Sequence, residues 1–176
     1  MGDLLRFELG PRRGLRRGTC ATAWYREGCA LEATDPARAV AAYERAIAGN
    51  PDLADAYNNL GRVVHDRHDQ GGQDGQHGPE PRALPLAESY YRLALCVDPE
   101  VALYWFNLGV SVEDQGRVSE AITAYERALA IDPTLADAHF NLARLLELVG
   151  RRSSDELILR RAVRHLVRYR DLARAG

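Results

Sequence analysis

The sequence lacks lysine altogether, has few cysteines and contains no long hydrophobic run; all 23 of its basic residues are arginine. No window supplies the ~20 consecutive apolar residues that a membrane-spanning helix requires, and no apolar block typical of a secretion signal occurs in the first twenty residues. We therefore expect a cytoplasmic protein without a membrane partner. Its three cysteines, Cys20, Cys29 and Cys96, are too widely spaced for a disulfide framework or a metal knuckle, and we expect them to fill small spaces at or near the core.

The composition is that of a soluble globular protein: 176 residues, of which 46% are apolar and 27% charged. The charge is distributed unevenly. Residues 1–18 and 151–176 are rich in arginine, whereas the formal net charge of the whole chain is −2, so the middle is acidic. We expect residues 1–18 to form a flexible basic segment ahead of a single domain at 19–176.

Internal repetition decides the predicted fold. The segment that begins at Ala102 recurs 34 residues later from Ala136, and the same spacing separates Pro99 from Pro133. Upstream, Tyr43 recurs 48 residues later as Tyr91, and the 14 extra residues lie between the two helices of that unit. In residues 118–130 the apolar positions follow the three-four spacing of a helix with one buried stripe. A hairpin of two such helices cannot bury its apolar face alone, so the units must stack.

These residues resemble the tetratricopeptide repeat, whose pattern is W-x2-L-G-x2-Y, then A-x3-F, then P. The third copy is nearly complete, with Trp105, Leu108 and Gly109 in its first half and Ala121 and Tyr125 in its second. The resemblance implies an all-α protein: an α-solenoid, a right-handed superhelix of eight helices in helix-turn-helix hairpins. Bacterial arrays of this kind, including those attached to MerR-type regulators, are similar to it. We place the repeats at about 20–51, 52–99, 100–133 and 134–174.

Two repeats depart from the pattern. In the second, the helix expected at 52–66 is followed by a Gly- and Pro-rich loop insertion at 67–84, which we predict to be flexible. In the fourth, Ser153 to Glu156 reads as a capping box that opens an extended last helix, lengthened at its front by the seven extra residues of that repeat. The outer face of that helix is expected to be a polar solubility cap carrying Arg160, Arg161, Arg164, Arg168 and Arg174.

The resemblance also implies where function lies. Such arrays generally hold peptide segments of partner proteins on a concave surface lined by the first helix of each hairpin. Asn59, Asn107 and Asn141 precede the Leu-Gly or Leu-Ala pair of their repeats, at a position that faces this surface in the family. An amide both donates and accepts, so it can pair with the backbone of an extended peptide of any sequence; the alternative is that asparagine is simply a common surface residue here. The other candidate groove residues are Tyr25, Asn58, Arg62, Phe106, Phe140 and Arg144.

One known ligand class fits poorly. Some tetratricopeptide domains grip a partner's C-terminal carboxylate with a clamp of basic residues and asparagine, but Tyr25, Leu103 and Asn107 occupy its basic positions here and Asn59 alone agrees. We therefore predict a non-catalytic scaffold that binds another protein or peptide. The alternatives are a structural, self-associating module and a part of a transcription-regulatory complex. No motif that reads nucleic acid accompanies the terminal arginines, so direct nucleic-acid binding is not expected.

The sequence offers no catalytic site, because nucleophile elbow, phosphate loop and zinc-protease motifs are all missing. Ligand-type side chains do cluster around the loop insertion. Their spacing gives at most one His-x-x-His pair in a Gly-rich stretch, and we therefore predict neither a metal site nor a cofactor. The residues are His65, Asp66, His68, Asp69, Asp74 and His77.

Overall fold

The computed structural model describes residues 14–70 and 82–175, and within them the chain forms eight helices and no strand. The helices are α1 (Gly14–Leu31), α2 (Pro36–Gly49), α3 (Ala54–Gln70), α4 (Ala83–Val97), α5 (Ala102–Asp114), α6 (Val118–Ile131), α7 (Ala136–Ser153) and α8 (Glu156–Ala175). The all-α fold and the eight helices predicted from the sequence are thus confirmed.

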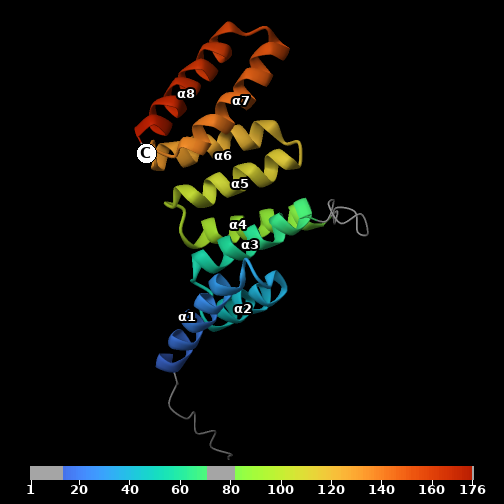
Figure 1. The fold of residues 1–176 in the computed structure, drawn as a ribbon, viewed down its shortest axis with the longest axis vertical. Coiled ribbons are helices and arrows are strands. Elements are labelled where there is room, and N and C mark those ends of the chain that lie inside the picture. The colour runs from blue at the N-terminus through green and yellow to red at the C-terminus, as the bar shows by residue number, and fades with distance from the viewer. Residues whose placement is uncertain (1–13, 71–81, 176) are drawn as a thin grey trace, which may run out of the picture.

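The helices pair in chain order into four antiparallel hairpins that stack along one axis (Figure 1). The second helix of each hairpin packs on the first helix of the next, so α2 meets α3, α4 meets α5 and α6 meets α7. Figure 1 shows the α1–α2 hairpin at one end of the stack and the α7–α8 hairpin at the other. The arrangement is an elongated solenoid in which each hairpin contacts only its neighbours.

Short polar signals set the helix boundaries. Asp35 accepts a hydrogen bond from the backbone N–H of Arg38 at 3.1 Å, and Pro36 opens α2. Helices α4 and α6 stop at Asp98 and Asp132, each of which is followed by proline. These stops allow the chain to reverse between hairpins within a few residues.

Each of the first three hairpins is closed by a tyrosine packed against a glycine. Gly109 is the clearest example: a Cβ on it would lie 2.6 Å from a ring carbon of Tyr125. Gly28 faces Tyr43 in the same way, and the three tyrosines Tyr43, Tyr91 and Tyr125 are all fully buried. The close approach of the two helices is what requires glycine here, rather than any unusual backbone angle.

Several expected details differ. Helix α3 runs to Gln70 and α4 begins at Ala83, so helix occupies part of the loop expected at 67–84; its residues 71–81 lie outside the described residues. Helix α1 begins at Gly14, so the basic segment expected to be flexible through residue 18 is helical from there on.

The expected capping box at Ser153 to Glu156 is wrong. Helix α7 continues through Ser153 and ends at Ser154, which adopts the left-handed conformation with φ of 54°. Asp155 then caps α8 by accepting hydrogen bonds from the backbone N–H groups of Leu157 (2.8 Å) and Ile158 (3.2 Å). The extra residues of this repeat therefore lengthen both helices of the hairpin: α7 has 18 residues where α5 has 13, and α8 has 20 where α6 has 14.

The cysteines are also placed differently from the prediction. Cys20, Cys29 and Cys96 are free thiols with exposed side chains, and none of them fills the core. Alanine takes that role instead: Ala39, Ala46, Ala87, Ala94, Ala121 and Ala128 are buried along the second helices of the hairpins.

Candidate functional site

The candidate groove residues lie on the first helices of the four hairpins, one group per helix. Tyr25 comes from α1; Asn58, Asn59 and Arg62 from α3; Phe106 and Asn107 from α5; Phe140, Asn141 and Arg144 from α7. Several of these side chains contact the neighbouring hairpin, so they lie at the junctions between hairpins.

At the junction of the first and second hairpins, a buried tyrosine organises the polar side chains. The hydroxyl of Tyr43 donates a hydrogen bond to Glu32, and the guanidinium of Arg62 pairs with the other oxygen of the same carboxylate. The amide Nδ2 of Asn59 lies 3.4 Å from the hydroxyl of Tyr43 and 3.4 Å from that of Tyr25. Both the asparagine and the arginine that the sequence singled out are therefore held by partners within the chain.

The junction of the third and fourth hairpins repeats this arrangement. Tyr125 donates to Glu113 at 2.8 Å, Asn141 Nδ2 lies 3.4 Å from the Tyr125 hydroxyl, and Arg144 pairs with Glu113. We call this set of four side chains, Glu, Tyr, Asn and Arg, the end-junction network. The ring of Phe106 packs beside it, with its centroid 5.8 Å from that of Tyr125.

The glutamates of the end-junction network were missed by sequence reasoning. Glu32 and Glu113 each lie four residues after the glycine of the repeat pattern, which is Gly28 in α1 and Gly109 in α5. This common offset is the signal that could have found them. Residues four apart share one face of a helix, so Glu113 in α5 lies one turn along from the glycine against which the tyrosine packs. Glu32 directly follows the last residue of α1 and continues the same spacing.

The tyrosines of the network are neutral hydrogen-bond donors. Burial, together with hydrogen bonding to Glu113, holds the pKa of Tyr125 well above its ordinary value. Burial and hydrogen bonds to Cys29 and Glu32 act in the same direction on the pKa of Tyr43. Burial also raises the pKa of Tyr25 to about 12. The three hydroxyl groups consequently keep their protons through the physiological pH range.

The middle junction, between the second and third hairpins, is built differently. Asn107 donates from Nδ2 to Asn58 Oδ1 at 2.8 Å, which joins α5 directly to α3. Asn58 in turn donates to Asn59 Oδ1 at 3.2 Å and is only 3% exposed. Its side chain is therefore used between the helices, and it is the least accessible of the candidate residues.

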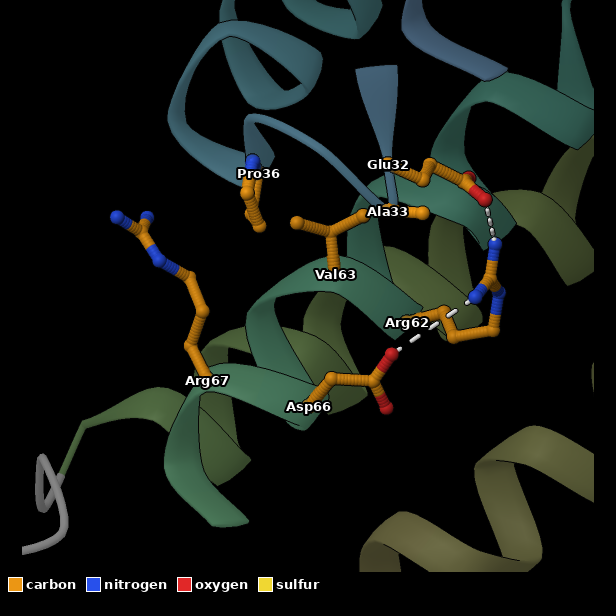
Figure 2. A pocket seen from close by; sticks show the side chains of 7 residues that line it. All are labelled: Glu32, Ala33, Pro36, Arg62, Val63, Asp66 and Arg67. Carbon is orange, nitrogen blue, oxygen red and sulfur yellow. Dashed lines mark hydrogen bonds and ion pairs between the residues drawn. The ribbon is translucent and has the colours of Figure 1, made fainter. Parts of the chain in front are cut away.

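A surface pocket of about 310 Å³ opens beside Arg62, between the α1–α2 turn and α3 (Figure 2). Figure 2 shows Arg62 between Glu32 and Asp66, 3.7 Å from the latter, while Arg67 lies across the pocket. Ala33, Pro36 and Val63 complete the lining. The pocket thus carries both signs of charge over an apolar floor.

The described residues contain no group of three or more His, Cys, Asp or Glu side chains placed to hold a metal ion. Of the ligand-type residues around the loop insertion, Asp74 and His77 lie outside the described residues, as do the side chains of His68 and Asp69. His65 is buried and pairs through Nε2 with Asp114 Oδ2 at 2.8 Å.

None of the helices in the part of the chain that the structure describes is both long and apolar enough to cross a membrane.

Comparison with known proteins identifies the repeats. The family model described as "Tetratricopeptide repeat" matches residues 29–70, and the one described as "TPR repeat" matches residues 113–150. Among curated proteins, none matches the sequence significantly.

Solved structures share the fold at low sequence identity. MamA superposes with a TM-score of 0.70 at 17% identity, over 88% of this chain and 79% of that one. The first TPR of Spaghetti (RPAP3), bound to the HSP90 peptide SRMEEVD, gives 0.65 at 16% identity, over 76% and 95% of the two chains. The Arabidopsis OM64 TPR domain gives 0.63 at 20% identity, over 73% and 96%.

Stacked hairpins that bury one another's apolar faces, with polar side chains repeated at each junction, define a helical-repeat solenoid. The two matches over residues 29–70 and 113–150 support a tetratricopeptide-repeat protein. The family is typically a non-catalytic protein-interaction fold, and its repeats support a protein-interaction scaffold here. A relation to arrays attached to MerR-type regulators stays a prediction.

Proposed function

We propose that this protein binds an extended peptide or a helix of a partner protein in a groove lined by α1, α3, α5 and α7. Its family supports an interaction scaffold, and a structure of similar fold, the first TPR of Spaghetti, is bound to a peptide. The single observation that carries the proposal is the recurrence of an oriented asparagine at one position of three successive first helices: Asn59, Asn107 and Asn141.

The internal hydrogen bonds orient all three amides and leave hydrogen-bonding capacity on two of them, Asn107 and Asn141. Asn59 is more fully engaged, because its nitrogen lies near the hydroxyl groups of Tyr25 and Tyr43 and its oxygen accepts from Asn58. Each amide nitrogen has two N–H groups, and the oxygens of Asn107 and Asn141 accept no hydrogen bond from the described part of the chain. All three side chains are only half-buried. A donor and an acceptor held in a fixed orientation lose little entropy when they pair with a peptide backbone.

The groove also offers apolar contact area. Leu103 on α5 and Phe140 on α7 are 48% and 43% exposed, and the ring of Phe140 lies 5.2 Å from that of Tyr169. The arginines beside them are already paired, Arg62 with Glu32 and Arg144 with Glu113. We therefore expect a ligand with apolar side chains rather than an acidic C-terminal tail.

A comparative affinity experiment from the lysate of the source organism tests this proposal. The double variant Leu103→Ser/Phe140→Ser removes two of the exposed apolar groups from the first helices, and Leu93→Ser removes a similarly exposed leucine (44%) from the second helix α4. A partner retained by wild type and by Leu93→Ser, but lost by the double variant, is the expected result. Retention by all three proteins would place the partner outside the groove.

The asparagines need their own control, because they also stabilise the array. Asn141→Ala should weaken partner binding by about 1 kcal/mol, the usual net value of one hydrogen bond. Tyr125→Phe removes the internal partner of the same amide and leaves the amide itself in place. If Tyr125→Phe weakens partner binding as much as Asn141→Ala does, the asparagine acts only through the tyrosine and the groove proposal loses its main support.

Self-association is the competing explanation, and light scattering separates the two. The proposal expects a molar mass that is independent of protein concentration in the absence of partner. A mass that rises with concentration, and falls again in Leu103→Ser/Phe140→Ser, would instead assign the apolar groove to a second copy of the chain.

A further inference from the structure

The last helix, α8, presents a face that the preceding second helices bury. Helices α2, α4 and α6 are each covered by the first helix of the following hairpin, whereas no helix follows α8 among residues 14–70 and 82–175. In Figure 1, α8 lies along the free end of the stack.

One repeated position is buried in the first three hairpins and exposed in α8. Tyr43, Tyr91 and Tyr125 occupy this position in the first three hairpins and are 0%, 1% and 0% exposed. Leu166 is its counterpart in the fourth, since it follows the buried Ala162 by four residues just as each tyrosine follows a buried alanine. Leu166 is 39% exposed. The position is apolar in all four hairpins, and only in α8 does it reach solvent.

Two further apolar side chains extend this surface. Val163 and Val167 are 58% and 41% exposed, and their spacing of four residues places them on one side of the helix, next to Leu166. We call these three residues the α8 stripe. The prediction that the outer face of α8 is a polar solubility cap is therefore wrong in this part: arginines are present, but they border an apolar stripe.

The charges beside the stripe are mainly positive, and Glu156, at the start of α8, is paired with Arg160. Arg160, Arg164 and Arg168 are exposed on α8, and neither Arg164 nor Arg168 forms an ion pair with any described residue. The one acidic residue near the end of the helix, Asp171, is paired with Arg170. A surface that covers the stripe is therefore favoured electrostatically if it is acidic.

A second copy of the chain is a poor occupant. If two copies packed through α8, the unpaired Arg164 and Arg168 of one would face the same arginines of the other. Head-to-tail packing onto residues 20–49 of the first hairpin finds no apolar complement there, because no large hydrophobic side chain is exposed in that range. Charge repulsion and the lack of an apolar complement thus favour a different protein, rather than a second copy of the chain, as the partner of the α8 stripe.

We propose that the α8 stripe docks an amphipathic helix with acidic flanks from a partner protein, in the place that the first helix of a further hairpin would take. The partner's apolar residues cover Val163, Leu166 and Val167, and its carboxylates pair with Arg164 and Arg168. This surface is separate from the groove of the first helices, so the scaffold would hold two partner segments at once.

Fluorescence anisotropy with the full chain and a pair of designed probes tests the proposal. Both probes are labelled helices of about five turns with a leucine stripe at three-four spacing; one has glutamate along both flanks and its twin has lysine. We expect the acidic probe to bind about tenfold or more tightly than its twin, and this preference to shrink as salt is added. Equal affinity for the two probes, or no saturable binding of either, would overturn the proposal.

Matched variants locate the binding. Val163→Ser/Val167→Ser should weaken the acidic probe about tenfold, whereas Leu93→Ser, an equally exposed leucine on α4, should leave its affinity unchanged. Arg164→Gln/Arg168→Gln should remove the preference for the acidic probe and leave the helical circular dichroism signal intact. Binding that is indifferent to both α8 variants would overturn the assignment, and so would a concentration-dependent dimer that Val163→Ser/Val167→Ser dissolves.

Discussion

The junctions at the two ends of the array differ from the junction in its middle. At both ends a glutamate, Glu32 or Glu113, accepts from a buried tyrosine and pairs with an arginine of the next hairpin. In the middle, His65 stands at the position of the glutamate and Val110 at that of the arginine. A buried tyrosine packed against a glycine is common to all three places, whereas the polar side chains around the tyrosine differ.

This difference indicates that the glutamate and the arginine of the end-junction network occur together or not at all. A glutamate at position 65 would lie buried without the arginine that Val110 replaces, at the cost of desolvating an unpaired charge. The middle junction instead uses direct contacts between α3 and α5, Asn107 with Asn58 and His65 with Asp114. Tight packing holds every junction, and hydrogen bonding adds to it in two different ways.

The largest expected effect on stability comes from removing the buried tyrosine that all three junctions share. Tyr125→Ala and Tyr91→Ala each delete a fully buried ring that packs against a glycine, and each should lower the free energy of unfolding by about 3–5 kcal/mol. Urea denaturation followed by circular dichroism measures both. A cost below about 1 kcal/mol at position 91 would mean that the middle junction does not depend on its tyrosine as the end junctions do.

Removing only the hydroxyl should separate the two kinds of junction. Tyr125→Phe loses a hydrogen bond to Glu113 and leaves that carboxylate without its donor, which should cost about 1–2 kcal/mol of unfolding free energy. The hydroxyl of Tyr91 makes no hydrogen bond within the described residues, so Tyr91→Phe should change stability by less than about 0.5 kcal/mol. Equal costs at the two positions would contradict the comparison.

Building the network into the middle junction is a sharper test. His65→Glu alone should destabilise the protein, because it buries a carboxylate without a cation. Adding Val110→Arg supplies the arginine at the position where Arg144 stands in the third junction. A double-mutant cycle measured by urea denaturation should give a favourable coupling of about 1 kcal/mol between the two substitutions. If the two changes in unfolding free energy were strictly additive, the arginine at position 110 would not interact with the glutamate at position 65.

The repeat spacing was enough to predict the architecture. A pattern that recurs every 34 residues specifies hairpins of fixed length, and the buried Gly-Tyr pairs such as Gly109 and Tyr125 follow from the same pattern. Because these positions are constrained by packing between two helices, the sequence carries them almost unchanged from copy to copy.

The polar contacts were harder to predict, since they depend on how hairpins sit against one another. Asn58 looked like a groove residue, yet it pairs with Asn107 across 49 residues of chain. The loop insertion lies within this stretch of sequence, so the 34-residue repeat spacing does not reveal the pair. The turn at Ser154 was missed for a similar reason: serine rarely adopts positive φ, and nothing in the local sequence demands it there.

The smallest expected effect concerns the fourth hairpin, where two histidines are paired, His139 on α7 and His165 on α8. His139 Nε2 lies 3.1 Å from the carbonyl oxygen of Pro133, which only accepts, so this nitrogen carries the proton. His139 Nδ1 is then the acceptor for the Nδ1–H of His165 at 2.8 Å. Burial, followed by the neighbouring ring of His139 and the positive charge of Arg161, lowers the pKa of His165 from its ordinary 6.5.

A lowered histidine pKa makes the unfolded state the better proton acceptor, so the stability it contributes is present above about pH 6.5 and is lost as the pH falls through the folded-state value. Urea denaturation at about pH 7.5 and about pH 5.5 should show a larger loss of stability for wild type than for His165→Gln. The effect is the smallest of the four because His165 keeps part of its surface in water. The tyrosines and arginines of the end-junction networks should not contribute, since the tyrosines hold their protons at both pH values and the arginines stay charged. An identical pH dependence in the two proteins would mean that the histidine pair is as insensitive to protons as the tyrosine networks are.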